Sequence, residues 1–281
     1  MAAFGNDFER AKHDWLYNAS SRQSVVLALV YCVLLFLLNA ALQVVAGLGF
    51  YAALYGAVAD LQTLEGENAN NFAKASIVGL MPAAVVSAAA AMWLTRFGNA
   101  GGTSGLNLHI PKLGWAGWLV VVAGFAITMY AVFIGTFTLL GIDPETYAPT
   151  MGGVNDDSSK AGFVEKAIAD LSDEPWLFAL ALPGVTIAVP VAEELIFRGA
   201  LFSALLRSPA GPWGAVVFTS ALWAVIHGAS APWLFVGIIF VMGLVLGLLL
   251  LRFGSLWVTI VCHCVWNSLS SLAIFGTQAA P

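Results

Sequence analysis

Long apolar stretches, separated by shorter polar segments, recur along the chain and predict helices that cross a membrane. Most of them are long enough to cross the roughly 30 Å hydrocarbon core of a bilayer. Seven spans are expected, at about residues 24–47, 72–94, 115–140, 175–207, 213–228, 233–251 and 256–275. Because the first and fourth stretches are long enough to be split, the pattern predicts an all-α, polytopic membrane helix bundle with about 7–8 transmembrane helices.

The composition narrows the classes of function that remain. Of the 281 residues, 60% are hydrophobic and only 10% are charged, and the net charge is −5. A soluble domain carries about 25% charged residues, so a soluble two-domain enzyme is not expected. High hydrophobicity excludes a disordered chain, and the lack of a basic surface excludes a nucleic-acid partner. The cysteines lie in apolar spans and are interpreted as small apolar residues rather than a disulfide framework: Cys32, Cys262 and Cys264.

Charges at the span ends predict the orientation of the chain. Lysine and arginine are enriched in cytoplasmic loops, and here they flank alternate span ends: Arg10, Lys12, Arg22, Arg96, Lys112, Arg207 and Arg252. The opposite side receives the 141–174 loop, which has eight acidic residues against two lysines. We therefore expect a cytoplasmic N-terminus and an extracytoplasmic acidic loop. Helical spacing within residues 158–171 predicts a surface helix, either a solvated cap or a gate for substrate.

The chain divides into three expected regions. Residues 1–23 form a cytoplasmic N-terminal segment, either a poorly ordered terminus or an interfacial helix, because apolar residues recur there at helical spacing. Residues 24–174 hold the N-terminal transmembrane helices and the acidic extracytoplasmic loop. Residues 175–281 form the expected catalytic core, since the ionisable residues inside the membrane are found there.

Three charged residues lie well inside a span, all in one short run of the fourth span. Glu194 and Arg198 are four residues apart, so they share a helix face in the favourable order for an ion pair. Glu193 points about 100° away from Glu194 and is free to face another group. Pro190, just before the carboxylates, predicts a kink. A structural ion pair explains Glu194 and Arg198 but gives Glu193 no role, so the run indicates a functional site.

Two histidines lie in later spans at a similar depth. His227 follows Trp223 by one helical turn, and His263 precedes Asn267 by one turn. At about 1.5 Å per residue, Glu193 and His227 both lie about 21 Å from the inner ends of their helices, and His263 lies about 16 Å from its own. One layer within the membrane can therefore hold all three side chains.

These residue types suit water attack on an amide carbonyl. Glu193 beside His227 can take a proton from water, and His263 with Asn267 can donate hydrogen bonds to the developing oxyanion. The ion pair of Glu194 would hold the catalytic helix in place. No cofactor is expected. Because glutamate and histidine are common zinc ligands, zinc held by Glu193, His227 and His263 is the alternative.

At this point the chain resembles a known family, the CAAX prenyl endopeptidase and bacteriocin-processing (CPBP, or Abi) intramembrane proteases. The family signature is EExxxR, then [FW]xxxH, then HxxxN on later helices. Here these motifs stand as Glu193-Glu194-Leu-Ile-Phe-Arg198, Trp223-Ala-Val-Ile-His227 and His263-Cys-Val-Trp-Asn267. The resemblance covers roughly residues 175–275. It implies a multi-helix membrane bundle that hydrolyses peptide bonds. The family is often described as metalloproteases, whereas structures of the family favour water activated by glutamate without a metal.

The same resemblance implies roles for individual residues. Glu193 and His227 would activate water, and His263 and Asn267 would form the oxyanion site. The ion pair Glu194–Arg198 is counted with the catalytic group, and Trp223 is the candidate substrate-binding residue.

The expected function is an intramembrane endopeptidase that acts on a peptide or membrane-protein substrate, in the plasma (inner) membrane of a bacterium. A non-catalytic family member, acting as a membrane scaffold or bacteriocin-immunity factor, is the second hypothesis. A proton-coupled transporter is the third, but no internal repeat supports it.

Overall fold

The computed structural model describes residues 25–56, 66–98, 106–142, 171, 174–206, 208–228, 231 and 233–278. The elements in these ranges are helices: α2 (Val25–Tyr55), α3 (Gly66–Gly98), α4 (Gly114–Leu140), α7 (Pro175–Pro183), η4 (Gly184–Ala188), α8 (Val189–Glu193), η5 (Glu194–Leu201), α9 (Phe202–Leu206), α10 (Gly211–His227), α11 (Trp233–Phe253) and α12 (Leu256–Gln278). The predicted all-α fold is confirmed. The helices expected within residues 1–23 and 158–171 lie outside the described residues, apart from Leu171 at the end of the second.

Each predicted span corresponds to a long helix or a continuous helical run. Six of them are long and apolar enough to cross a membrane, including the 32-residue run Pro175–Leu206. The remaining one is α10, which has 17 residues. The first stretch forms a single helix of 31 residues rather than two. Within the described residues the predicted polytopic bundle is thus confirmed, with six helices that can cross a membrane and α10 as a seventh, shorter one, and the chain is an integral membrane protein.

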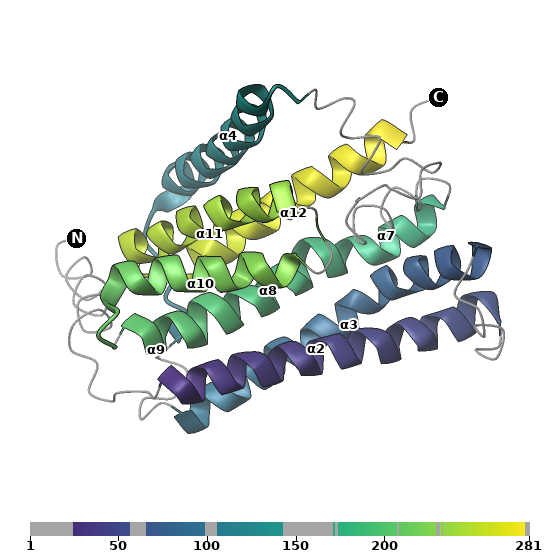
Figure 1. The fold of residues 1–281 in the computed structure, drawn as a ribbon, viewed down its shortest axis with the longest axis horizontal. Helices are drawn as coiled ribbons and strands as arrows, with labels where there is room; N and C mark the ends of the chain where they lie inside the picture. The colour runs from purple at the N-terminus through teal and green to yellow at the C-terminus, as the bar shows by residue number, and fades with distance from the viewer. Residues whose placement is uncertain are drawn as a thin grey trace.

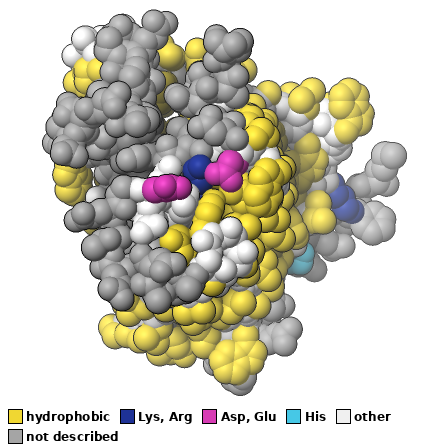
Figure 2. Space-filling view, turned by 90° about the vertical axis from the view of Figure 1, so that its right-hand side faces the viewer, with side chains coloured by type: hydrophobic (Ala, Val, Ile, Leu, Met, Phe, Trp, Pro, Cys, Tyr) yellow, Lys and Arg dark blue, Asp and Glu magenta, His cyan; other side chains and the backbone are white. Residues whose placement is uncertain are grey.

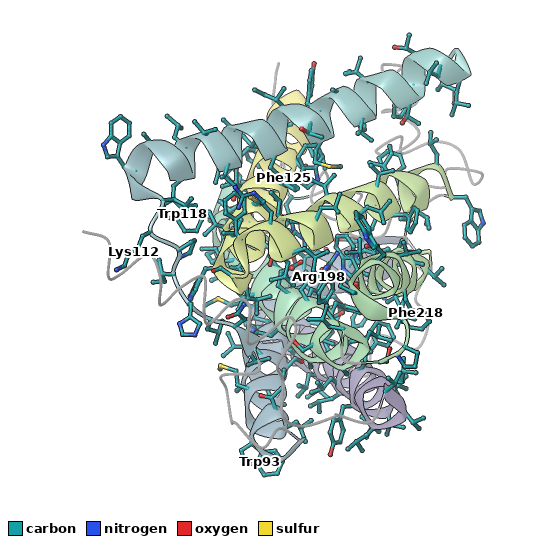
Figure 3. All side chains as sticks on the ribbon, turned by 90° about the vertical axis from the view of Figure 1, so that its left-hand side faces the viewer. Trp93, Lys112, Trp118, Phe125, Arg198 and Phe218 are labelled. Atoms are coloured by element: carbon teal, nitrogen blue, oxygen red, sulfur yellow. The ribbon has the colours of Figure 1, made fainter. Side chains whose placement is uncertain are left out.

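Most of the helices run along the long axis of the bundle and reverse direction from one span to the next (Figure 1), whereas α4 is steeply inclined to this axis (Figure 3). The pair α2 and α3 covers one side of the run α7–α9, and α10, α11 and α12 cover the other. One end of the bundle collects the start of α2, the end of α3, the end of α9 and the turn between α11 and α12. This is the grouping that the basic flanks predicted. Which end faces the cytoplasm stays a prediction.

Helix α4 lies along the outside of the bundle, against α11 and α12. Its outer face is apolar, with Trp115 82% exposed and Leu139 88% exposed. Trp118 and Phe125 point from α4 toward the other helices (Figure 3), and Phe125 is only 3% exposed. A membrane helix can expose such a face because lipid tails are as apolar as leucine.

Small residues let neighbouring helices approach closely. Gly243 and Gly247, one turn apart on α11, lie against α10: a Cβ at Gly243 would be 2.8 Å from the Ser220 Cβ, and one at Gly247 would be 3.2 Å from a Val216 methyl. The GxxxG pair in the sequence predicts this close packing, since a larger residue would hold the two backbones apart.

The opposite end of the bundle carries an ion pair that links two spans. Lys74 on α3 donates from Nζ to Glu174 Oε1 at 2.6 Å, directly before α7 begins. Figure 2 looks onto this end and shows basic and acidic side chains side by side among hydrophobic ones. Lys74 is thus a basic residue on the side that carries the acidic 141–174 loop, and its charge is paired with Glu174.

A short segment before α4 holds the start of α12 in place. The Leu256 backbone N–H donates to the Asn107 carbonyl at 3.0 Å, and the Trp257 indole donates to the Leu108 carbonyl at 3.0 Å. The Asn107 amide also donates to the Gly254 carbonyl. These contacts fix the position of α12, the helix that carries His263 and Asn267.

Candidate active site

The fourth span departs from regular α-helix on both sides of its carboxylates. The π-helical segment η4 ends at Ala188, directly before α8, and η5 begins at Glu194. Pro190 lies in the first turn of α8. A proline cannot donate to the carbonyl four residues earlier, so an altered hydrogen-bond pattern beside it is expected. The expected disturbance at Pro190 therefore takes the form of π-helical turns, which are frequent at functional sites.

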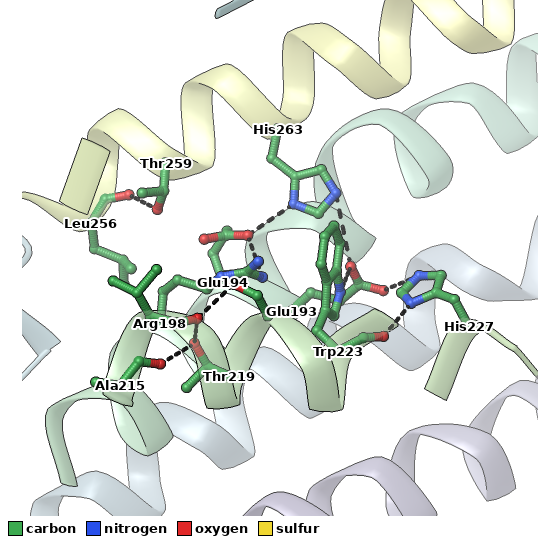
Figure 4. A network of polar contacts seen from close by, with 12 residues as sticks. Glu193, Glu194, Arg198, Ala215, Thr219, Trp223, His227, Leu256, Thr259 and His263 are labelled. Atoms are coloured by element: carbon green, nitrogen blue, oxygen red, sulfur yellow. Dashed lines mark hydrogen bonds and ion pairs between the residues drawn. The ribbon is translucent and has the colours of Figure 1, made fainter. Parts of the chain in front are cut away.

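Glu194 and Arg198 form the predicted ion pair, and it is completely buried. Arg198 Nη1 donates to Glu194 Oε1 at 3.0 Å, and both side chains are 0% exposed. His263 Nδ1 lies 3.0 Å from the same carboxylate oxygen. Because an ionised carboxylate only accepts hydrogen bonds, Nδ1 carries a hydrogen here. The pair therefore joins the fourth span to α12 and orients the His263 ring (Figure 4).

Glu193 lies at the centre of the cluster and is 22% exposed. Its Oε2 accepts a hydrogen bond from the Trp223 indole at 2.9 Å. His227 Nε2 lies 3.7 Å from Oε1, and His263 Nε2 lies 3.8 Å from Oε2. The structure thus brings together the glutamate and the two histidines that the depth argument placed in one layer (Figure 4).

Each histidine presents its Nε2 to Glu193 because its Nδ1 is already engaged. His227 Nδ1 lies 2.8 Å from the Trp223 carbonyl, an acceptor, so this nitrogen also carries a hydrogen. In the neutral ring the Nε2 atom is then an acceptor. Distances of 3.7 and 3.8 Å exceed a direct hydrogen bond. A water molecule to one side of the line, about 2.8 Å from both atoms, can join each pair.

Trp223 contacts four other side chains of the site: Glu193, Arg198, His227 and His263. Its ring lies under the Arg198 guanidinium, with 4.3 Å from Cζ to the ring centroid. The rings of His227 and His263 meet it edge-on, with centroid distances of 5.1 and 5.3 Å. It is 2% exposed. Its role in binding substrate stays a prediction, and its hydrogen bond to Glu193 is a positioning contact that the sequence does not reveal.

Asn267 lies one turn beyond His263 and makes a different contact. Its Nδ2 donates to the Val185 carbonyl in η4 at 3.1 Å. One of its two amide hydrogens is thereby used, and the second can donate to another acceptor. Within the described residues, His263 faces the two glutamates whereas Asn267 faces η4. The joint oxyanion role of this pair therefore stays a prediction.

A cavity opens beside Glu193 and His227. Its volume is about 70 Å³, and one water needs roughly 10–15 Å³ on this measure, so it has room for several. Part of its lining comes from α2 and includes Asn39 and Gln43. Sequence reasoning missed these two side chains. The sequence feature that could have indicated them is a pair of carboxamides four residues apart in a span that has no charged residue.

The oxygen atoms of glutamate and the nitrogen atoms of histidine are both common zinc ligands. Among the described residues, however, no group of three His, Cys, Asp or Glu side chains has an arrangement that could hold a metal ion. The residue types therefore fit zinc, but the arrangement of their side chains does not. The reaction proposed for this site uses no metal. The predicted absence of a cofactor remains for experiment to test.

Comparison with known proteins bears on the part of the chain that carries this cluster. Searches of curated proteins and of solved structures found no match. Residues 175–269 match the family model described as Type II CAAX prenyl endopeptidase Rce1-like. All the residues of the three motifs fall inside this range. The match confirms the resemblance over this segment and supports a CAAX-type intramembrane protease function.

Proposed function

We propose that the protein is an intramembrane endopeptidase that hydrolyses peptide bonds with water activated by Glu193 and His227. The observation that carries the proposal is the position of Glu193. This carboxylate lies within the membrane, is 22% exposed beside a cavity, and has the Nε2 atoms of two histidines at 3.7 and 3.8 Å. A buried structural carboxylate would be closed off in the way that Glu194 is.

In the proposed reaction, Glu193 takes a proton from a water molecule that lies beside it and His227 Nε2. The water oxygen forms a bond to the carbonyl carbon of the substrate, and the carbonyl oxygen becomes an oxyanion. The carbon–nitrogen bond then breaks, and the proton held by Glu193 passes to the leaving amine. Proton transfer by a positioned side chain contributes about 10²–10⁴-fold to the rate of such a step.

The oxyanion would be stabilised from α12. The free amide hydrogen of Asn267 is one donor. His263 is the second when its ring carries both hydrogens, because Nδ1–H then donates to Glu194 and Nε2–H is available to the oxyanion. Removing one such donor from an enzyme that uses it lowers the rate by about 10²–10³-fold. Trp223 would keep Glu193 oriented, and Arg198 would keep Glu194 ionised.

The proposal is tested with purified protein in liposomes and a library of short synthetic peptides, with and without a farnesylated C-terminal cysteine. Mass spectrometry identifies the cleaved bonds. Wild-type protein should cleave members of the library, and Glu193→Ala and His227→Ala should abolish cleavage without loss of folding. Glu67→Gln, which changes an exposed carboxylate at the start of α3, is the control and should remain active.

The second hypothesis is a non-catalytic scaffold or immunity factor. The partial exposure of Glu193 beside a cavity favours catalysis over this role. Complementation separates the two: if Glu193→Ala restores the phenotype of a deletion strain in full, binding rather than catalysis is the function. A plasma-membrane location in a bacterium and a cytoplasmic N-terminus belong to the same proposal, and reporter fusions to each end of the chain test them.

A further inference from the structure

The wall of the cavity that α2 forms is polar in an otherwise apolar helix. Asn39 and Gln43 are four residues apart, so they lie on one face of α2. Both line the cavity together with Glu193 and His227. Phe36, one turn earlier, also lines it and is 38% exposed, so the cavity reaches the surface of the molecule beside α2. Two carboxamides thus line the same solvent-sized space as the proposed catalytic pair.

The two carboxamides are held differently. The Ser87 hydroxyl on α3 lies 3.1 Å from the Asn39 carboxamide and 2.8 Å from the Ala83 carbonyl, so one contact holds the Asn39 side chain and at least one of its Nδ2 hydrogens is left to donate. Gln43 makes no side-chain hydrogen bond within the described part of the chain. A carboxamide supplies two donor hydrogens and an accepting oxygen. A polar group with no partner inside a membrane is costly, so a bound ligand that pairs with Gln43 would remove that cost.

The spacing of the pair suits an extended peptide. Four residues of α-helix rise about 6 Å. Along one edge of an extended chain, peptide groups of the same orientation recur every two residues, or about 6.6 Å. Asn39 and Gln43 can therefore each bind a peptide group of one strand laid along α2. Main-chain binding of this kind gives affinity without requiring particular side chains, as in strand addition to a sheet edge.

We infer that Asn39 and Gln43 bind the main chain of the substrate in an extended conformation and so position its scissile bond against Glu193. The inference rests on the proposed function and adds a substrate-binding wall to it. Asn39 Nδ2 donates to a substrate carbonyl, and Gln43 Oε1 accepts from a substrate N–H two residues away. Both are positioning residues, since they do not take part in proton transfer or bond formation.

The first test separates binding from chemistry. The peptide that wild-type protein cleaves best in the library is used to measure KM and kcat for Gln43→Met and Asn39→Leu, which keep the size of each side chain and remove the amide. Loss of one hydrogen bond made equally in the ground and transition states raises KM and leaves kcat close to wild type. We expect KM to rise about 3- to 10-fold for each variant. Val44→Leu, on the neighbouring 53% exposed position, is the control and should change neither constant.

The second test asks whether the main chain is what Gln43 recognises. Analogues of the same peptide replace one amide at a time by an ester, which lacks the N–H. At one position near the scissile bond, the ester should raise KM of wild-type protein about 3- to 10-fold. The same ester should have little further effect on Gln43→Met, because the hydrogen bond is already lost. Equal ester effects in wild type and Gln43→Met at every position would overturn the inference.

The outcomes distinguish this inference from the function on which it rests. If wild type, Gln43→Met and Asn39→Leu cleave with the same KM, the wall is not a binding site and the proposed protease function stands. If wild-type protein cleaves no peptide in the library, the proposed function falls and the inference falls with it. Should Asn39→Leu unfold because the Ser87 contact is lost, Gln43→Met, which breaks no side-chain hydrogen bond among the described residues, decides the matter alone.

Discussion

The buried pair Glu194–Arg198 allows a sharp test of how the site is held together. Arg198→Met removes the guanidinium and leaves Glu194, at 0% exposure, without its cationic partner, beside His263 Nδ1 at 3.0 Å. Removing one member of a buried ion pair costs about 3–5 kcal/mol, because a charge remains without its partner. Glu194→Leu likewise leaves the buried Arg198 charge without its partner. Each single variant should therefore lose about 3–5 kcal/mol of unfolding free energy.

The double variant Glu194→Leu/Arg198→Met should lose less than the sum of the two. Three atoms of the pair have no hydrogen-bond partner among the described residues: Glu194 Oε2, Arg198 Nε and Arg198 Nη2. Burial of these atoms is therefore only partly compensated in the wild-type protein, and removing both side chains removes that penalty. Residues in direct contact show coupling free energies of about 0.5–3 kcal/mol, and for this pair we expect a value in the upper part of that range.

The assay is reversible unfolding in mixed detergent micelles, followed by circular dichroism, for wild type, both single variants and the double variant. Single-variant losses that add to the double-variant loss within about 0.5 kcal/mol would refute the reasoning. The double variant should have reduced activity even where it is folded, because His263 has lost the Nδ1 partner that orients it. Outer partners of this kind affect activity by about 10- to 100-fold in metal sites, and we expect a similar loss here.

Three further predictions follow from other contacts. Trp223→Phe removes the 2.9 Å hydrogen bond to Glu193, and such a bond to a charged acceptor is worth about 1.5–3 kcal/mol. We therefore expect kcat to fall about 10- to 100-fold with folding retained. An unchanged kcat would show that the indole does not orient the glutamate. Treatment with a zinc chelator should leave peptide cleavage unchanged, whereas loss of activity that added zinc restores would favour the zinc alternative. Gly243→Leu should destabilise the protein by about 1–3 kcal/mol, because it overpacks the contact between α10 and α11. Gly237→Leu is the control and should not destabilise it, since a Cβ there meets nothing within 4 Å. Equal effects of the two variants would contradict the close packing at Gly243.

The sequence was enough to predict the fold because membrane spans are encoded locally. An apolar run of sufficient length must form a helix in lipid, where every backbone group needs an internal partner. The same local geometry predicted the Glu194–Arg198 pair, since residues four apart on a helix are neighbours. The rise per residue also placed Glu193, His227 and His263 in one layer, and the structure brings these three side chains together.

Contacts between helices were harder to predict because they depend on how each helix is rotated about its axis. His263 and Asn267 lie on one face of α12, yet the first contacts Glu194 and the second contacts Val185. The hydrogen bond from Trp223 to Glu193 and the position of Gln43 in the cavity beside the glutamate arise in the same way. The π-helical turns around α8 change the rotation of the fourth span, and a regular 3.6-residue pattern does not describe them.

The most direct test of the central claim is the turnover of one variant, Glu193→Gln, against wild type on the same peptide in water enriched in oxygen-18. The account predicts that wild-type protein places one heavy oxygen in the new carboxyl group of the product. It also predicts that Glu193→Gln, which keeps the size of the side chain and cannot accept the proton of water, loses at least about 100-fold in kcat. Turnover by folded Glu193→Gln at the wild-type rate would contradict the account.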